Sequence, residues 1–255
     1  DALSTASLCK NFGALRVLRD IDFHLPHGCR HALIGPNGSG KTTTLNVISA
    51  LYRADGGSIR FDGTELIGRP AHAIARLGVA RTFQNIRLFG DLSVVENVMI
   101  GRHVRTRTGF VGALLPGGAT AREERATRER ALELLQFVGL EGVGGASARS
   151  LPYGDQRRVE IARALASEPR LLLLDEPAAG MNPTETDTLV ALLRRIRDQG
   201  TTLLLIEHDM NLVMSVSDRI TVLNFGQHIA EGPPDEIARN RDVITAYLGG
   251  TLDAA

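Results

Sequence analysis

The chain has 255 residues, 43% of them hydrophobic, and its 29 acidic residues balance 29 basic ones. This length allows one large or two small domains with an ample core, and the zero net charge argues against a nucleic-acid-binding surface. No apolar run approaches the roughly 18 residues that span a bilayer and no signal peptide opens the chain, so we expect any membrane role to come through a partner.

Residues 1–30 alternate between apolar and polar positions, which is typical of β structure. Residues 3–8 and 21–25 carry the alternation, and a turn follows at 26–28. Another short strand is indicated at 58–61, where an Asp-Gly turn ends it. We therefore expect a small antiparallel β layer built from the N-terminal part of the chain.

Two features bear on the cellular setting. Cys9 and Cys29 form neither a close pair nor a metal-binding spacing, so a reducing cytosol is the simplest setting. The chain starts at Asp1 rather than Met, and we expect a processed, trimmed or excised segment, with these alternatives left open.

A glycine-rich stretch at residues 35–42 matches the phosphate-binding loop G-x-x-x-x-G-K-[ST] at every specified position. An apolar run at 31–34 predicts a buried strand before it, and 43–51 predicts a helix after it. This context makes a chance match in a glycine-rich turn a poor alternative. Backbone N–H groups and the helix N-terminus would bind a phosphate chain.

Two side chains of this loop have specific roles in such motifs. Lys41 reaches the β- and γ-phosphates, and the Thr42 hydroxyl ligates Mg²⁺. The chain has only one other lysine, Lys10, which suggests that the site needs a compact ammonium rather than a guanidinium. The expected phosphate-binding residues are Gly35, Pro36, Asn37, Gly38, Ser39, Gly40, Lys41, Thr42 and Thr43.

The middle of the chain carries few strong signals. Residues 81–85 indicate a strand that breaks into a polar segment, and 106–120 predict a mobile surface insertion rich in glycine and basic residues. Residues 121–138 predict an amphipathic helix with Leu132, Leu135 and Val138 on one face. A glycine-rich connector follows.

Two apolar strands that end in polar side chains are predicted in the second half. Four leucines at 171–174 lead into Asp175 and Glu176, and residues 202–206 lead into Glu207 and His208. Such runs suit strands that are buried on both faces of a parallel sheet, whose carboxyl ends bind ligands. Asp175 fits the acid that holds Mg²⁺ through water, and Glu176 fits a general base that orients an attacking water. His208 alone is more often structural, but its place one strand after the acids favours a functional role.

Residues 150–158 read Ser-Leu-Pro-Tyr-Gly-Asp-Gln-Arg-Arg and resemble the signature of the nucleotide-binding subunits of ABC transporters, usually Leu-Ser-Gly-Gly-Gln. The resemblance extends over nearly the whole chain. It implies a signature helix whose start, at Tyr153, Gly154 and Asp155, grips the γ-phosphate of ATP held by an opposite subunit. It also implies that residues 178–183 cross the dimer interface.

The same resemblance assigns three further roles. It makes Gln84 a sensor of the γ-phosphate and of Mg²⁺, which with Thr42 and Asp175 completes the expected metal set. It makes His208 a switch residue, so that the expected catalytic residues are Glu176, His208 and Gln84. It makes Phe12 a platform for the adenine ring, although an ordinary packing role for Phe12 stays open.

The signature departs from the usual family pattern in two places. Pro152 stands where the family usually has serine, which removes a hydroxyl and a backbone N–H. Asp155 stands where it usually has glutamine, which places a negative charge near a polyanion. We expect both to weaken phosphate binding at this interface without abolishing it.

Within the family, residues 81–89, 175–183 and 232–249 are similar to the ATPases of branched-chain, or hydrophobic, amino acid importers. Relatives serve urea, amides or aromatic acids, or extract lipopolysaccharide, and the chain alone leaves the substrate open. A soluble ABC ATPase without a transporter and a regulatory module without turnover are further alternatives. Apolar residues at Ile86, Leu88 and Phe89 are expected to form a groove for the permease, unless they belong to the core.

The resemblance implies an α/β fold with three parts. A phosphate-loop NTPase core with a mostly parallel sheet and the β layer would take residues 1–85 and 166–249, and a helical subdomain would take 86–165, with a tail at 250–255. ATP and Mg²⁺ are the expected cofactors. The expected partners are a second ATPase subunit, identical or different, integral membrane permease subunits and, indirectly, a substrate-binding protein, with no nucleic acid. The expected place is the cytoplasmic face of the cell membrane, and excision from a permease–ATPase fusion stays open.

Overall fold

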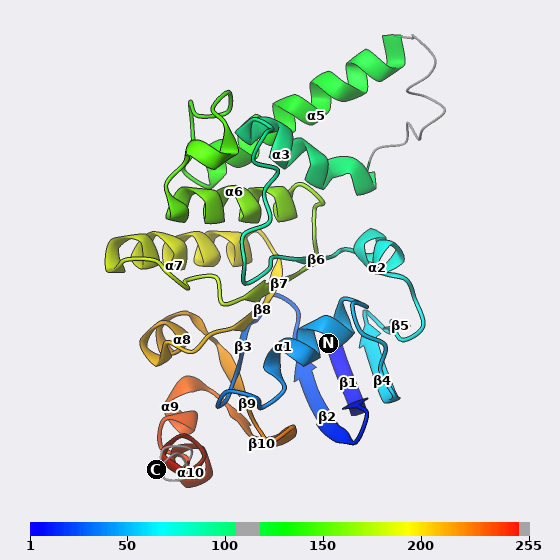
Figure 1. Cartoon of the computed structure of the whole chain (residues 1–255), viewed down its shortest axis with the longest axis vertical. Helices are drawn as coiled ribbons and strands as arrows, with labels where there is room; N and C mark the ends of the chain where they lie inside the picture. Colours follow the sequence, from blue (N-terminus) through cyan, green and yellow to red (C-terminus); the bar gives the residue numbers. More distant parts are fainter. Residues whose placement is uncertain (106–117, 250–255) are drawn as a thin grey trace.

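The structure is a computed structural model that describes residues 1–105 and 118–249 (Figure 1). Most of the predicted insertion, at 106–117, and the predicted tail at 250–255 therefore lie outside the described residues. The last three residues of the predicted insertion do not belong to it, because helix α5 (Gly118–Phe137) already begins at Gly118. Helix ends are the least certain feature of a sequence-based assignment.

The predicted antiparallel β layer is confirmed. Within the described residues it is a four-stranded sheet in the order β2-β1-β4-β5. The two strands of its long hairpin, β1 and β2, are longer than the alternation indicated. The strands are β1 (Leu3–Phe12), β2 (Leu15–Leu25), β4 (Gly56–Phe61) and β5 (Thr64–Glu65).

The second sheet of the described chain has six strands in the order β10-β9-β3-β8-β7-β6 and is parallel except for β10. The phosphate-loop strand β3 therefore lies inside the sheet, between β9 and β8. The strands are β3 (Arg30–Ile34), β6 (Val79–Arg81), β7 (Leu171–Asp175), β8 (Thr202–Ile206), β9 (Arg219–Asn224) and β10 (Gln227–Gly232).

The leucines of β7 show why this sheet is buried on both faces. Leu171 and Leu173 join the hydrophobic cluster beneath the β layer and α1, whereas Leu172 and Leu174 join the cluster beneath α6, α7 and α8. Side chains alternate between the faces of a strand, so a continuous apolar run fills two cores at once. The prediction of a strand buried on both faces is confirmed.

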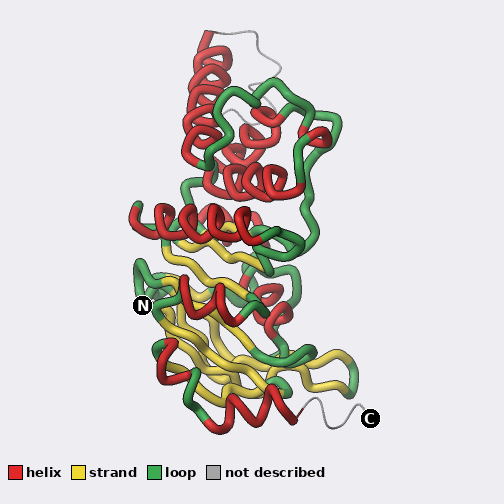
Figure 2. Tube along the Cα trace, turned by 90° about the vertical axis from the view of Figure 1, so that its left-hand side faces the viewer, coloured by secondary structure: helices red, strands yellow, loops and turns green. Residues whose placement is uncertain are grey.

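Helices cover both faces of this sheet and gather at one end of the molecule. Figure 1 shows α3, α5 and α6 together at the end that is farthest from the β layer, and Figure 2 shows the strands confined to the other part. The core cluster beneath α6 and α7 also contains apolar residues of α3 and α5, so the helical end shares a core with the sheet. The predicted α/β fold is confirmed, while the proposed boundaries at 85/86 and 165/166 stay a prediction. The remaining helices are α1 (Lys41–Ile48), α2 (Ala71–Leu77), α3 (Val94–Gly101), α6 (Tyr153–Leu165), α7 (Pro183–Asp198), α8 (Met210–Val216), α9 (Pro234–Ile237) and α10 (Arg241–Gly249), with 3₁₀ turns at Arg102–Arg105 and Ala148–Ser150.

Helix α1 begins two residues earlier than predicted. Gly40 precedes it with φ 103°, a left-handed conformation that glycine adopts without strain, and so the helix begins at Lys41. Its end comes at Ile48, because the N–H groups of Leu51 and Tyr52 turn back to the carbonyl of Asn46. None of the described helices combines the length and the apolar content needed to cross a membrane.

Candidate functional site

The phosphate loop joins β3 to α1, and close packing requires glycine at Gly35 and Gly40. A Cβ at Gly35, whose φ is 150°, would lie 2.0 Å from the carbonyl oxygen of Leu223. The loop is also tied to the β9–β10 turn, because the N–H of Gly226 donates to Ser39 O at 3.1 Å. The loop backbone is therefore fixed by its neighbours on the sheet, as a preformed phosphate site requires.

Lys41 closes this loop onto itself. Its Nζ donates to Gly35 O at 2.8 Å and to Pro36 O at 3.0 Å. Burial lowers the pKa of Lys41, while the carboxylates of Glu176 and Asp175 oppose that shift. The two acids that the sequence predicted at the carboxyl ends of the central strands thus act electrostatically on the ammonium of Lys41.

Asp175, the last residue of β7, is 2% exposed. Its Oδ2 accepts a 2.8 Å hydrogen bond from Arg81 Nη2, and its Oδ1 is buried without a partner. Burial raises the pKa of Asp175, and the hydrogen bond from Arg81 opposes this effect. A buried carboxylate oxygen left open fits a cation or an ordered water, as the predicted Mg²⁺ site requires.

Three of the predicted residues meet at a single carboxylate. Gln84 Nε2 donates to Glu176 Oε2 at 2.8 Å, and His208 Nδ1 lies 3.8 Å from the same oxygen. Glu176 follows β7, Gln84 follows β6 and His208 follows β8, so three adjacent strands deliver them to one edge of the sheet. Glu176 has φ 46°, an uncommon conformation for a residue with a side chain.

Sequence reasoning named Glu207 after the strand 202–206 but assigned it no role, and the structure shows it to be 1% exposed. One of its oxygens accepts from the N–H of Ala178 at 2.8 Å, and the other accepts from the N–H of His208 at 3.3 Å. Burial raises the pKa of Glu207. Glu207 thereby ties the residues after β8 to the start of segment 178–183. An acid directly after an apolar strand was the available signal.

The signature helix α6 begins at Tyr153, and Pro152 precedes it with φ −53°. Gly154 is buried against the side chain of Glu185, and the ring of Tyr153 lies against Gly180 in segment 178–183. A larger residue at either glycine would meet these side chains. The signature is therefore joined within the chain to the segment expected at a dimer interface.

The charge of Asp155 is not left free. Its Oδ1 accepts from Arg158 Nη2 at 2.5 Å, and Arg158 Nη1 donates to the carbonyls of Val138 and Gly139. In this conformation an arginine one turn later compensates the charge of Asp155 within α6. The expected weakening of phosphate binding by Asp155 stays a prediction.

Phe12 ends β1 and is 44% exposed. Its ring meets Tyr52 edge-on at 5.2 Å, and Lys10 Nζ lies 5.2 Å from its centroid. Phe12 therefore lies at the end of a strand of the β layer with an aromatic and a cationic neighbour. Its role toward adenine stays a prediction.

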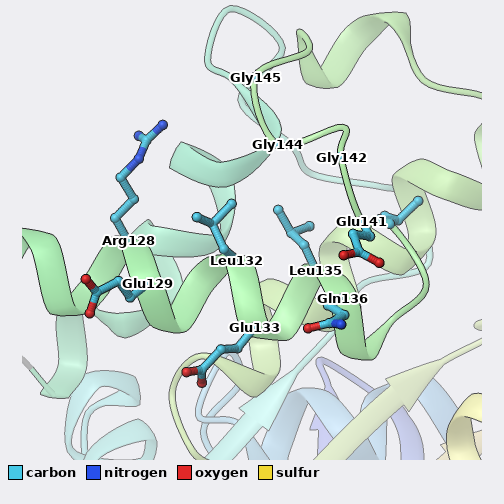
Figure 3. Close-up of a pocket in the computed structure, with 11 residues that line it drawn as sticks. Arg128, Glu129, Leu132, Glu133, Leu135, Gln136, Glu141, Gly142, Gly144 and Gly145 are labelled. Atoms are coloured by element: carbon cyan, nitrogen blue, oxygen red, sulfur yellow. The ribbon is translucent and has the colours of Figure 1, made fainter.

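A hollow outside the acid cluster, of about 520 Å³, lies between α5 and the glycine-rich loop after it. Figure 3 shows Leu132 and Leu135 of α5 pointing toward the loop that carries Gly144. Charged side chains such as Arg128 and Glu133 surround the opening, and none of the predicted site residues lines it.

Comparisons with known proteins agree with this geometry. Residues 18–179 match the family model described as ABC transporter, and residues 227–253 match the model of the branched-chain amino acid ATP-binding cassette transporter. The chain is 47% identical to the high-affinity branched-chain amino acid transport ATP-binding protein BraF of Pseudomonas aeruginosa, over 97% of each chain. The chain belongs to the ATP-binding cassette family of ABC transporters.

Solved structures lead to the same family. The ADP conformation of the cassette MJ1267 superposes with a TM-score of 0.85 at 30% identity, over 97% of this chain and 98% of that one. A dimeric post-hydrolysis state of the cassette MJ0796, bound to ADP and Pi, superposes with a TM-score of 0.77 at 25% identity, over 91% and 98%.

Proposed function

We propose that this chain is the ATP-hydrolysing subunit of an importer of branched-chain amino acids. The observation that carries the chemistry is the convergence of Gln84 and His208 on one oxygen of Glu176, beside Lys41 and Asp175. The similarity to BraF along the whole chain and the match at residues 227–253 support the substrate class.

In this proposal the phosphate loop binds the phosphate chain of ATP through its backbone N–H groups. Lys41 exchanges the carbonyls of Gly35 and Pro36 for phosphate oxygens. Thr42, Gln84 and the open Oδ1 of Asp175 are the residues that would hold Mg²⁺, which neutralises the charge that develops on the phosphates. Asp175 is oriented for this by Arg81, which holds its other oxygen.

Glu176 accepts the proton of the attacking water and orients it. Gln84 keeps the Glu176 carboxylate in place through their 2.8 Å hydrogen bond, and His208 completes the polar wall around the terminal phosphate. The reaction releases ADP and phosphate. Replacing Glu176 by glutamine tests this step.

The second half of the site would come from another ATPase subunit. The start of α6, with Tyr153, Gly154 and Asp155, would face the γ-phosphate bound by the partner. The dimeric relative bound to ADP and Pi supports this arrangement. Pairing of Asp155 with Arg158 reduces the negative charge at the N-terminus of α6, which favours anion binding there.

A groove of about 390 Å³ is proposed to receive the permease. It runs between α2 and β6 on one side and α3 and α6 on the other. Phe89, which is 54% exposed, and Ile100, which is 40% exposed, offer it apolar surface. Leu88 does not belong to this surface, since it packs against the core cluster. Through this groove the subunit would be held at the cytoplasmic face of the membrane.

Co-expression with the permease and binding protein encoded beside it tests the transport role. The tagged chain is expected to purify with the permease, and the reconstituted complex should import leucine, isoleucine or valine only with ATP. A complex that forms and hydrolyses ATP but imports none of the three would reject the substrate class and keep the ATPase.

A further inference from the structure

Arg157, in α6, is 0% exposed although it carries a charge and five donors. Its Nη1 donates to Phe83 O at 2.6 Å, and its Nη2 donates to Gln84 O at 2.7 Å. The planar guanidinium of Arg157 makes four hydrogen bonds in a fixed orientation, whereas a lysine ammonium has only three N–H donors. The signature helix thus binds the backbone of Gln84, and the side chain of Gln84 donates to Glu176.

Glu160, one turn later in α6, binds both Arg157 and the backbone of Phe83. Its Oε2 accepts from Arg157 Nη1 at 2.8 Å, and its Oε1 accepts from the N–H of Phe83 at 3.4 Å. Both the N–H and the C=O of Phe83 are therefore bound by this one helix. Figure 1 shows the chain after β6 passing α6 on its way to α3.

The same guanidinium reaches the signature itself. Arg157 Nη2 also donates to the hydroxyl of Tyr153 at 3.2 Å. One buried side chain therefore contacts the backbone of Gln84 on one side and the first residue of α6 on the other.

A buried ion pair is a poor way to gain stability, because apolar residues of similar volume often serve as well. What Arg157 provides instead is a fixed geometry between two functional parts. We infer that Arg157 is a positioning residue that couples Gln84 to the signature helix, so that nucleotide contacts made by Gln84 set the position of Tyr153. The inference rests on the proposed role of Gln84 as a sensor.

A double-mutant cycle tests the coupling. In the Glu176→Gln background with Mg-ATP, sedimentation gives the dimer dissociation constant for Gln84→Ala, Arg157→Lys and the double variant. Arg157→Lys keeps a charge beside Glu160, but its three N–H donors cannot replace the four hydrogen bonds of the planar guanidinium. Each single change should weaken the dimer by about tenfold or more, as coupling energies in proteins allow. If the two residues are coupled, the dissociation constant of the double variant should be within about twofold of the larger of the two single-variant constants. Independent sites would instead add their free-energy losses.

Arg102→Lys is the control. Arg102 pairs with Glu168 and not with Glu160, the acid that binds Phe83. Its effect should multiply with that of Gln84→Ala. Binding of a fluorescent ATP analogue to the monomer should be unchanged by Arg157→Lys, which separates coupling from loss of the nucleotide site.

The outcomes distinguish the two proposals. Losses that multiply for Gln84→Ala and Arg157→Lys overturn the coupling alone. A dimer unaffected by Gln84→Ala overturns the sensor role and, with it, the coupling. If Arg157→Lys fails to fold, the double variant Arg157→Met with Glu160→Met takes its place, because it removes both buried charges together.

Discussion

Arg81 Nη2 donates a 2.8 Å hydrogen bond to Asp175 Oδ2, and both side chains are buried, at 7% and 3% exposed. The Nη1 of the same arginine donates to Asn46 Oδ1 at 2.7 Å and to Ser49 Oγ at 2.9 Å. Arg81 therefore joins the end of α1 to the acid at the end of β7. It fixes the helix that follows the phosphate loop relative to the carboxylate expected to hold Mg²⁺.

Replacing Arg81 by methionine should lower the free energy of unfolding by about 3–5 kcal/mol, because it leaves a buried carboxylate without its partner. Urea unfolding without nucleotide measures this. Adding Asp175→Asn should restore a large part of the loss. Arg149→Met serves as the control, because Arg149 and Asp91 form a highly exposed pair, at 74% and 93%, whose loss should cost less than about 1 kcal/mol. Equal losses for Arg81 and Arg149 would contradict the importance of burial.

The burial of His31 in β3 predicts how the free energy of unfolding depends on pH. The side chain is buried, and its Nε2 lies 2.7 Å from Thr221 Oγ1. Burial lowers the pKa of His31 to about 4, with the charge of Glu231 opposing the shift. The unfolded chain takes up this proton near pH 6.5, so the contribution of His31 is complete above that pH and is lost as the pH falls toward 4.

The free energy of unfolding should fall by about 3 kcal/mol between pH 6.5 and about pH 4 because of His31. Urea unfolding from pH 7 to pH 4 should show a shallower decline for His31→Gln than for the parent. His72→Gln, at an exposed position, should follow the parent. Parallel curves for the parent and His31→Gln would show that His31 is not the cause.

Phe12→Ala should weaken ATP and ADP equally, by about 1–3 kcal/mol, if the ring stacks on the base that both nucleotides share. Titration with fluorescent analogues of each nucleotide measures this. Tyr52→Ala removes the aromatic neighbour of Phe12 and should leave both affinities nearly unchanged. If Phe12→Ala changes thermal stability but neither affinity, Phe12 has only a packing role.

Phe89→Asp should abolish co-purification with the permease while the ATPase rate of the isolated subunit stays that of the parent. A charge in an exposed part of the groove disturbs a docking surface without reaching the core. Leu88→Asp is the informative contrast, because Leu88 packs on the core and its replacement should lower the melting temperature. Retention of the permease by folded Phe89→Asp would move the docking surface elsewhere.

The local patterns of the sequence were sufficient to predict the phosphate loop, the strand buried on both faces and the polar residues at the strand ends. Each depends on neighbouring residues, such as the four leucines before Asp175. Adjacency at one sheet edge then follows from the rule that parallel strands present their carboxyl ends together, which is why Gln84, Glu176 and His208 could be expected near one another.

Pairs that join distant segments could not be predicted in this way. Arg81 and Asp175 are 94 residues apart, and Arg157 and Phe83 are 74 apart. Nothing in the local pattern distinguishes these arginines from exposed ones, because the chain is rich in arginine throughout. The pairing of Asp155 with Arg158 lay within reach, since residues three apart on a helix are neighbours. The helix register at the signature had to be known first.

The rate of ATP hydrolysis by Glu176→Gln tests the central claim most directly. Because the amide cannot accept the proton of the attacking water, hydrolysis should slow by about 10²–10⁴-fold while ATP binding is kept and an ATP-bound dimer accumulates. Glu168→Gln, at an acid paired with Arg102 away from the strand ends, should keep the parent rate. A Glu176→Gln protein that binds ATP and hydrolyses it at the parent rate would contradict the account.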